Sequence, residues 1–99
     1  MSPTSLRRDV VIERVQTGVR LEKRMLKVLK ALADSLDLTL GDLLEGIVLH
    51  ALEGKAPFSK PTRAKVAELR KVFGLTLTAA DAHRLTEKAR SERAARSVR

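Results

Sequence analysis

The 99-residue sequence has no Cys, no Trp and no Tyr, and it has only two His. The absence of Cys excludes disulfides, thiol chemistry and thiolate zinc sites, and it is typical of proteins in a reducing cytoplasm. The two His have no accompanying set of carboxylates, so the sequence predicts no metal site. Because Ser, Asp and His are scattered without the spacing of a nucleophile and its base, we expect no catalytic residue, no cofactor and no enzyme activity.

Long apolar runs are also missing. Near its start the chain has only the short run Val10, Val11 and Ile12 before charged residues return. A membrane span needs about 20 apolar residues, so we expect neither a membrane span nor a signal peptide. The length allows one small domain, or a dimerisation unit with an appendage.

Positive charge is in excess and unevenly spread. The formal net charge is +8. Residues 1–21 carry +2, residues 22–54 carry −2, and residues 55–99 carry +8, from twelve basic and four acidic groups. A basic chain favours an acidic partner such as nucleic acid or an anionic membrane surface.

Residues 14–21 have the period-two pattern of a half-buried strand. Val15, Val19 and Leu21 share one parity. The other parity carries Arg14, Gln16 and Arg20.

The pattern then changes to helical spacing. We expect a helix over residues 22–36, and a second helix that Thr39 caps with Asp42 three residues later and that ends at Gly54. Residues 55–61 contain two Pro and read as a linker. A further helical pair is predicted over residues 62–73 and 82–89, the latter after Thr78 and Asp81, which again have the spacing of a capping box.

A single strand and two helices bury too little apolar surface to fold alone. Two copies of residues 14–21 could pair antiparallel, with their apolar faces covered by the helices of both chains. The other face would then present Gln16 and Arg20 twice, on a ribbon narrow enough for the DNA major groove. Arg donates a bidentate pair to guanine and Gln to adenine. The alternative is an ordinary solvated strand face.

The order strand, helix, turn and Thr-capped helix, with the run Val-Arg-Leu-Glu-Lys-Arg-Met-Leu entering the first helix, resembles the ribbon-helix-helix transcription factors of the Arc, MetJ and CopG type. The likeness covers residues 14–54. It implies a mainly α fold with one short strand, an obligate homodimer with an intersubunit two-stranded antiparallel β-ribbon, and base contacts from Gln16, Gly18 and Arg20. Gly18 departs from the polar residue usual at the middle position.

The resemblance also implies a phosphate site at the first amides of the second helix, because a helix N-terminus attracts anions. A plain N-cap is the alternative reading of the same residues. Gly46, in mid-helix, is explained by close crossing of two such helices at the dimer axis, or as a tolerated weak point. The expected phosphate contacts are Arg14, Thr39, Leu40 and Gly41. The expected dimer core is Val15, Val19, Leu21, Leu44, Gly46, Ile47 and Val48.

These patterns divide the chain into four parts: a flexible N-terminal arm (1–13), a dimerisation and DNA-binding domain (14–54), a linker (55–61) and a basic helical C-terminal extension (62–99), frayed from about residue 91. The extension has three interpretations: a helical pair that packs on the dimer or joins dimers along DNA, a segment that binds a toxin or other protein, or a basic arm for phosphates. The sequence predicts a cytoplasmic homodimer that binds double-stranded DNA with sequence specificity and does not bind a membrane. We expect it to regulate transcription, as a repressor. The alternative is an antitoxin or other protein-interaction module.

Overall fold

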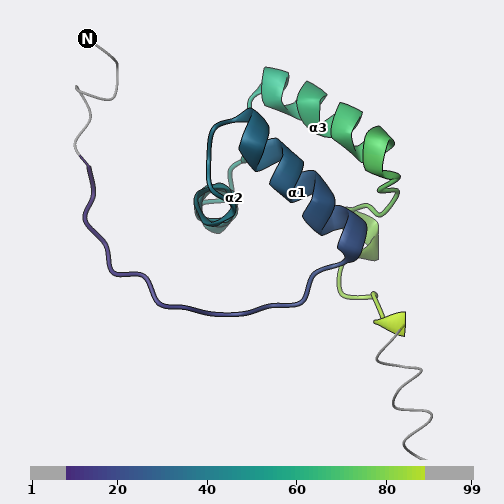
Figure 1. Ribbon diagram of the computed structural model, residues 1–99, viewed down its shortest axis with the longest axis horizontal. Coiled ribbons are helices and arrows are strands. Elements are labelled where there is room, and N and C mark those ends of the chain that lie inside the picture. The colour runs from purple at the N-terminus through teal and green to yellow at the C-terminus, as the bar shows by residue number, and fades with distance from the viewer. Residues whose placement is uncertain (1–8, 89–99) are drawn as a thin grey trace, which may run out of the picture.

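The computed structural model describes residues 9–88, which are mainly helical (Figure 1). The described residues form α1 (Lys23–Ser35), α2 (Leu40–Leu52), α3 (Lys60–Phe73) and a single 3-10 turn, η2 (Ala79–Asp81). No strand occurs between residues 9 and 88. The expectation of a mainly α fold is therefore confirmed, whereas the short strand is not seen.

The helix α1 lies within one residue of the predicted range at each end. It begins after Glu22, whose carboxylate accepts a hydrogen bond from the Met25 amide at 2.8 Å. It ends where Asp37 takes a left-handed φ of 56° and the Leu38 amide donates to the Ala33 carbonyl at 2.9 Å. This turn brings Thr39 into position to start the next helix.

Local hydrogen bonds define both ends of α2. The Thr39 hydroxyl accepts a hydrogen bond from the Asp42 amide at 3.1 Å, as the capping pattern predicts. At the other end Gly54 has φ 72°, and the Lys55 amide donates to the His50 carbonyl at 2.8 Å. Gly54 is thus confirmed as the stop, because the left-handed conformation suits a residue without Cβ.

The helix α3 begins at Lys60, so the stretch between α2 and α3 is residues 53–59, as long as the linker expected over residues 55–61 but two residues earlier in the chain. Ser59 caps the helix, and Pro61 occupies its first turn, where a residue without an N–H costs no hydrogen bond. Gly74 ends the helix with φ 67°.

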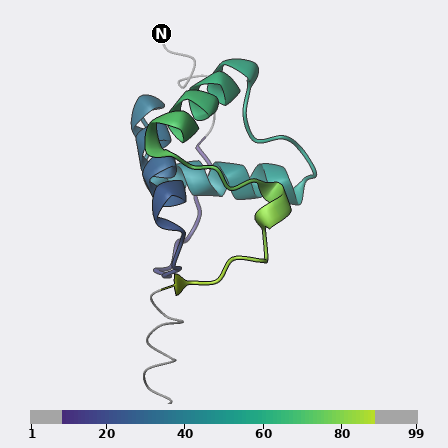
Figure 2. The ribbon, with the colours of Figure 1, turned by 90° about the vertical axis from the view of Figure 1, so that its right-hand side faces the viewer.

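The core lies where α1 meets α2 and α3. Leu32 and Ala33 of α1 and Leu43 of α2 are buried together. Partly buried apolar side chains from all three helices and the α2–α3 connection pack against them: Leu29, Ile47, Phe58, Val66 and Leu69. Figures 1 and 2 show α1 flanked by α2 and α3. The segment that we expected to be a C-terminal extension therefore contributes a helix to the same core.

Residues 14–21 are extended but unpaired, which corrects the predicted strand (Figure 1). A strand is defined by hydrogen bonds to a neighbouring strand. The described residues of one chain offer no second extended segment paired with this one. The period-two pattern thus predicted an extended backbone correctly, but this chain alone does not pair it.

The helix expected over residues 82–89 is also corrected. The Thr78 amide donates to the Asp81 carboxylate at 2.8 Å, so the capping contact forms. Only the 3-10 turn η2 follows this contact. The chain does not continue as a helix, because Ala82 is extended (ψ 139°) and His83 has a left-handed φ of 68°. Leu85 lies in a non-helical stretch. Ala89, the expected fraying from residue 91 and most of the N-terminal arm lie outside the described residues.

The core predicts a large difference between two apolar truncations. Leu32 is 1% exposed, whereas Val72 on α3 is 68% exposed. Leu32→Ala should lower the free energy of unfolding by about 2–5 kcal/mol through lost burial and a cavity. Val72→Ala should change it by less than about 0.5 kcal/mol. Urea unfolding at one fixed protein concentration measures both, and equal losses would place the core elsewhere.

Candidate nucleic-acid interface

The expected base-reading residues lie on an extended segment that enters α1. Gln16, Gly18 and Arg20 are all exposed. The apolar side chains that alternate with them are also exposed: Val15 is 80% and Val19 75% exposed. No atom within 4 Å would meet a Cβ at Gly18, so packing in one chain does not require glycine there. Both faces of the segment are therefore exposed to solvent in the single chain.

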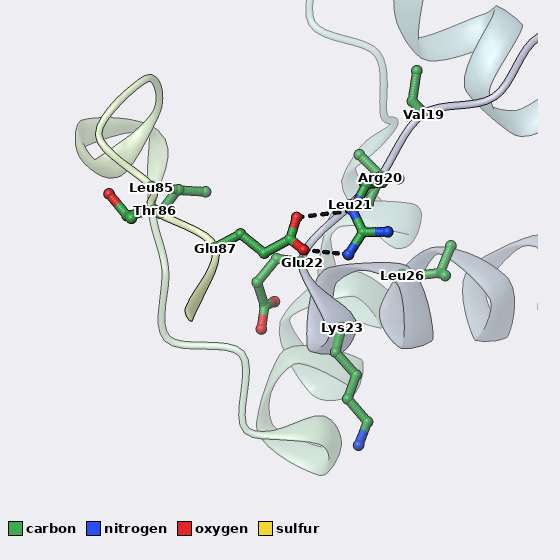
Figure 3. Close-up of a pocket in the computed structure, with 9 residues that line it drawn as sticks. All are labelled: Val19, Arg20, Leu21, Glu22, Lys23, Leu26, Leu85, Thr86 and Glu87. Carbon is green, nitrogen blue, oxygen red and sulfur yellow. Dashed lines mark hydrogen bonds and ion pairs between the residues drawn. The ribbon is translucent and has the colours of Figure 1, made fainter. Parts of the chain in front are cut away.

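Arg20 has a partner in its own chain. Its Nε donates to one Glu87 carboxylate oxygen at 2.9 Å, and its Nη2 donates to the other oxygen (Figure 3). The hydrogen bond and the charge of Glu87 raise the pKa of Arg20. This ion pair joins the N-terminal extended segment to the C-terminal segment 84–88, and the two segments line one surface hollow.

Arg14 is held in the same way on α2. Its Nε and Nη2 donate to the two oxygens of Glu45 at 2.8 and 2.7 Å, and Nη2 also reaches Asp42 at 3.3 Å. The hydrogen bond from Arg14 lowers the pKa of Glu45, with the charge of Arg14 acting in the same direction against partial desolvation. Because all three side chains are exposed, this contact positions the segment more than it stabilises the fold.

The expected phosphate site at the start of α2 is only partly open. Thr39 already accepts a hydrogen bond from the Asp42 amide, which leaves the earlier amides of Leu40 and Gly41. Gly41 is exposed, and a Cβ there would meet only the Thr39 hydroxyl, at 3.9 Å. The Asp42 carboxylate in the first turn carries the charge sign that opposes an anion. An anion here would therefore depend on nearby cations such as Arg14.

The expected dimer-core residues of α2 fall into two groups. Ile47 packs against the core of its own chain, and Leu44 and Gly46 are half-buried. Val48 is exposed, together with Leu49 and Leu52 further along the helix. A Cβ at Gly46 would meet nothing within 4 Å, so a single chain does not explain this glycine. The helix α2 is thus apolar toward α1 and apolar again on a face that its own chain leaves uncovered.

Two carboxylates of this region were not anticipated from the sequence. Glu45 lies three residues after Asp42, a spacing that places both on one side of a helix, so a cation partner was foreseeable there. Glu87 lies 67 residues from Arg20, and no local pattern signals that contact.

Neither a metal-type cluster of side chains nor a membrane-spanning helix occurs between residues 9 and 88. No three His, Cys, Asp or Glu side chains are grouped there as a metal ion would need. None of the helices in this part of the chain has the length and apolar character to cross a membrane.

The Arg14–Glu45 contact predicts an acid-sensitive interaction. Since the folded-state pKa of Glu45 is lowered, the contact stabilises the fold above the usual Glu value of about 4.3 and is lost as the pH falls through the lower folded value. NMR titration of the Glu45 carboxyl carbon should give a midpoint below that usual value. Arg14→Ala should move the midpoint back up, and Arg14→Lys should move it partway. An unchanged midpoint in Arg14→Ala would contradict the contact.

The chain matches no protein-family model, no curated protein and no solved structure. What its residues do is therefore inferred from their own chemistry and positions.

Proposed function

We propose that the chain is a homodimeric, sequence-specific DNA-binding regulator of the ribbon-helix-helix type. In this proposal two copies of residues 14–21 pair antiparallel and insert into the major groove of double-stranded DNA. The regulator acts by occupying an operator with two-fold symmetry.

The observation that carries the proposal is the uncovered apolar surface. Val15 and Val19 are largely exposed on a segment whose backbone is extended and unpaired. The helix α2 adds a second uncovered set, Val48, Leu49 and Leu52. Exposed apolar side chains that gather in a patch mark an interaction site, and a helix that is apolar on most sides requires burial.

A second copy of the chain accounts for both surfaces with one interface. Pairing of the extended segments supplies the missing backbone hydrogen bonds and buries Val15, Val19 and Leu21. Crossing of the two α2 helices on the side of Val48, Leu49 and Leu52 buries these residues. Gly46 lies nearly opposite Val48 on the helix, so its lack of a Cβ would permit close approach only on that other side. The same arrangement leaves the opposite parity of the ribbon to solvent.

The side chains on the outer face of the proposed ribbon have the chemistry of base recognition. Arg20 donates the bidentate pair that matches guanine O6 and N7, and Gln16 matches adenine N6 and N7. Gly18 between them leaves room for water or a close approach to the bases. The net charge of +8 supports binding to a polyanion, with Arg14 and the amides of Leu40 and Gly41 as the proposed phosphate contacts.

A protein-interaction module of the antitoxin kind remains the competing hypothesis, because the exposed apolar face of α2 suits a protein partner as well as a second copy. The two hypotheses differ in what the surface binds first. Self-association without any partner, and enrichment of an inverted repeat from a random DNA pool, support the regulator.

The proposed dimer predicts a contrast between two chemically identical substitutions. Val19 and Val72 are exposed to similar degrees in a single chain, at 75% and 68%. Val19→Glu should abolish dimerisation and lower the melting temperature, because it buries a charge in the paired ribbon. Val72→Glu lies outside the proposed interface and should do neither. Sedimentation and thermal melting measure both, and the melting temperature of the parent should rise with protein concentration. Equal behaviour of the two variants would refute the dimer.

The proposed reading face predicts sequence-selective losses. Arg20→Ala and Gln16→Ala should each cost about 1–3 kcal/mol on the preferred duplex and relax base preference at the contacted pair. Arg63→Ala, which removes one exposed charge from α3, should leave base preference unchanged. Fluorescence anisotropy with the selected duplex and a shuffled duplex separates these effects. Parent-like binding by both ribbon variants would show that this face does not read DNA.

A further inference from the structure

We propose that Glu87 is a positioning residue for Arg20: its carboxylate holds one edge of the guanidinium and thereby directs the other edge toward a guanine. This inference rests on the proposed function, since it gives the Arg20–Glu87 contact a role in base recognition.

The contact engages only part of the guanidinium. Glu87 takes the Nε–H and one Nη2–H, and the donation from Nε spans 2.9 Å (Figure 3). A guanidinium carries five N–H groups, so both hydrogens of Nη1 and one of Nη2 are not used by this contact. One hydrogen of Nη1 and the remaining hydrogen of Nη2 lie on the edge that points away from Nε.

That outer edge is the one suited to guanine. A bidentate contact to O6 and N7 needs two roughly parallel N–H groups, and Nη1 and Nη2 supply such a pair. The Arg20 side chain is 66% exposed, whereas that of Glu87 is 34% exposed. The carboxylate is thus the less accessible of the two groups, and the cation is the group presented to solvent.

The chain brings Glu87 to this position through a series of defined contacts. Leu75 is buried after the end of α3, and Arg70 donates to the Leu77 carbonyl at 2.7 Å. The Thr78–Asp81 contact then turns the chain at η2, and Figure 2 shows segment 84–88 returning to the start of α1. Leu85 and Thr86 line the same hollow as Val19 and Leu21. The position of Glu87 therefore follows from the packing of α3 on α1.

An arginine that is ordered before binding increases selectivity for the preferred DNA sequence more than it increases affinity for DNA of any sequence. A free arginine loses side-chain freedom when it binds a base, and ordering it beforehand removes part of that cost. The negative charge of Glu87 at the same time reduces attraction to phosphates in any sequence. Removal of Glu87 should therefore act in opposite directions on the preferred duplex and on shuffled DNA.

The test compares Glu87→Gln with Glu68→Gln, a matched control that removes one exposed negative charge from α3. Both variants should melt with the parent. We measure affinity for the duplex selected from a random pool and for a shuffled duplex of equal length. Glu87→Gln should lose roughly five- to tenfold on the selected duplex, near the lower end of the cost of a lost base contact. Glu68→Gln should bind both duplexes as tightly as the parent or slightly more tightly.

Two further measurements distinguish positioning from a general structural effect. Replacement of the contacted guanine by 7-deazaguanine, which lacks the N7 acceptor, should weaken the parent more than Glu87→Gln. In an Arg20→Ala background, Glu87→Gln should cause no further loss on the selected duplex.

The outcomes separate this inference from the function on which it rests. If Arg20→Ala binds the selected duplex like the parent, the proposed reading face fails. If Arg20→Ala is weakened but Glu87→Gln behaves like Glu68→Gln, the positioning role is overturned. Tighter binding by Glu87→Gln to the selected duplex alone would also overturn it, because Glu87 would then block Arg20.

Discussion

The fold depends on the burial of Leu32 and Ala33, through which α1 contacts its two neighbouring helices. Leu43 packs on these residues from α2, and Val66 and Leu69 close over them from α3. The described residues have few other buried apolar side chains, chiefly Val28 and Leu75. A single chain of this size therefore has a small core, and much of its apolar surface stays uncovered. The proposed dimer would bury part of this exposed apolar surface, since small domains commonly rely on association to bury enough apolar surface to be stable.

Each of the two arginines of the extended segment forms an ion pair with a carboxylate from a different part of the chain. Glu45 holds Arg14 on α2, and Glu87 holds Arg20 beside the start of α1. These contacts fix the segment near both of its ends while the intervening side chains stay exposed. In the proposed complex with DNA, the two sites would behave differently. Arg14 would exchange Glu45 for a phosphate, whereas Arg20 would keep Glu87 and use its outer edge.

Local chemistry made the helices predictable, and long-range contacts made the rest unpredictable. Thr39 and Gly54 define α2 by hydrogen bonds within a few residues, so the sequence alone located its ends. The start of α3 was missed by two residues because Pro61 was taken as a linker signal, although proline suits a first helical turn. The left-handed φ of His83 is incompatible with the helix predicted over residues 82–89, and the capping-box spacing on which that prediction was based does not signal it. The Arg20–Glu87 contact joins distant positions that no local pattern connects, and the proposed pairing of residues 14–21 would need a second chain.

The central position of α1 also has a consequence for the order of folding. Contacts between α1 and α2 join residues close in sequence, such as Leu32 and Leu43, so this helical hairpin closes a short loop. Contacts from α3 close a loop roughly three times as long, and the contact of Glu87 with Arg20 closes a longer one still. Folding rates fall as contacts become less local. We therefore expect the α1–α2 hairpin to form first and α3 to dock on it afterwards. In the proposed dimer, association of two chains would be a further, concentration-dependent step.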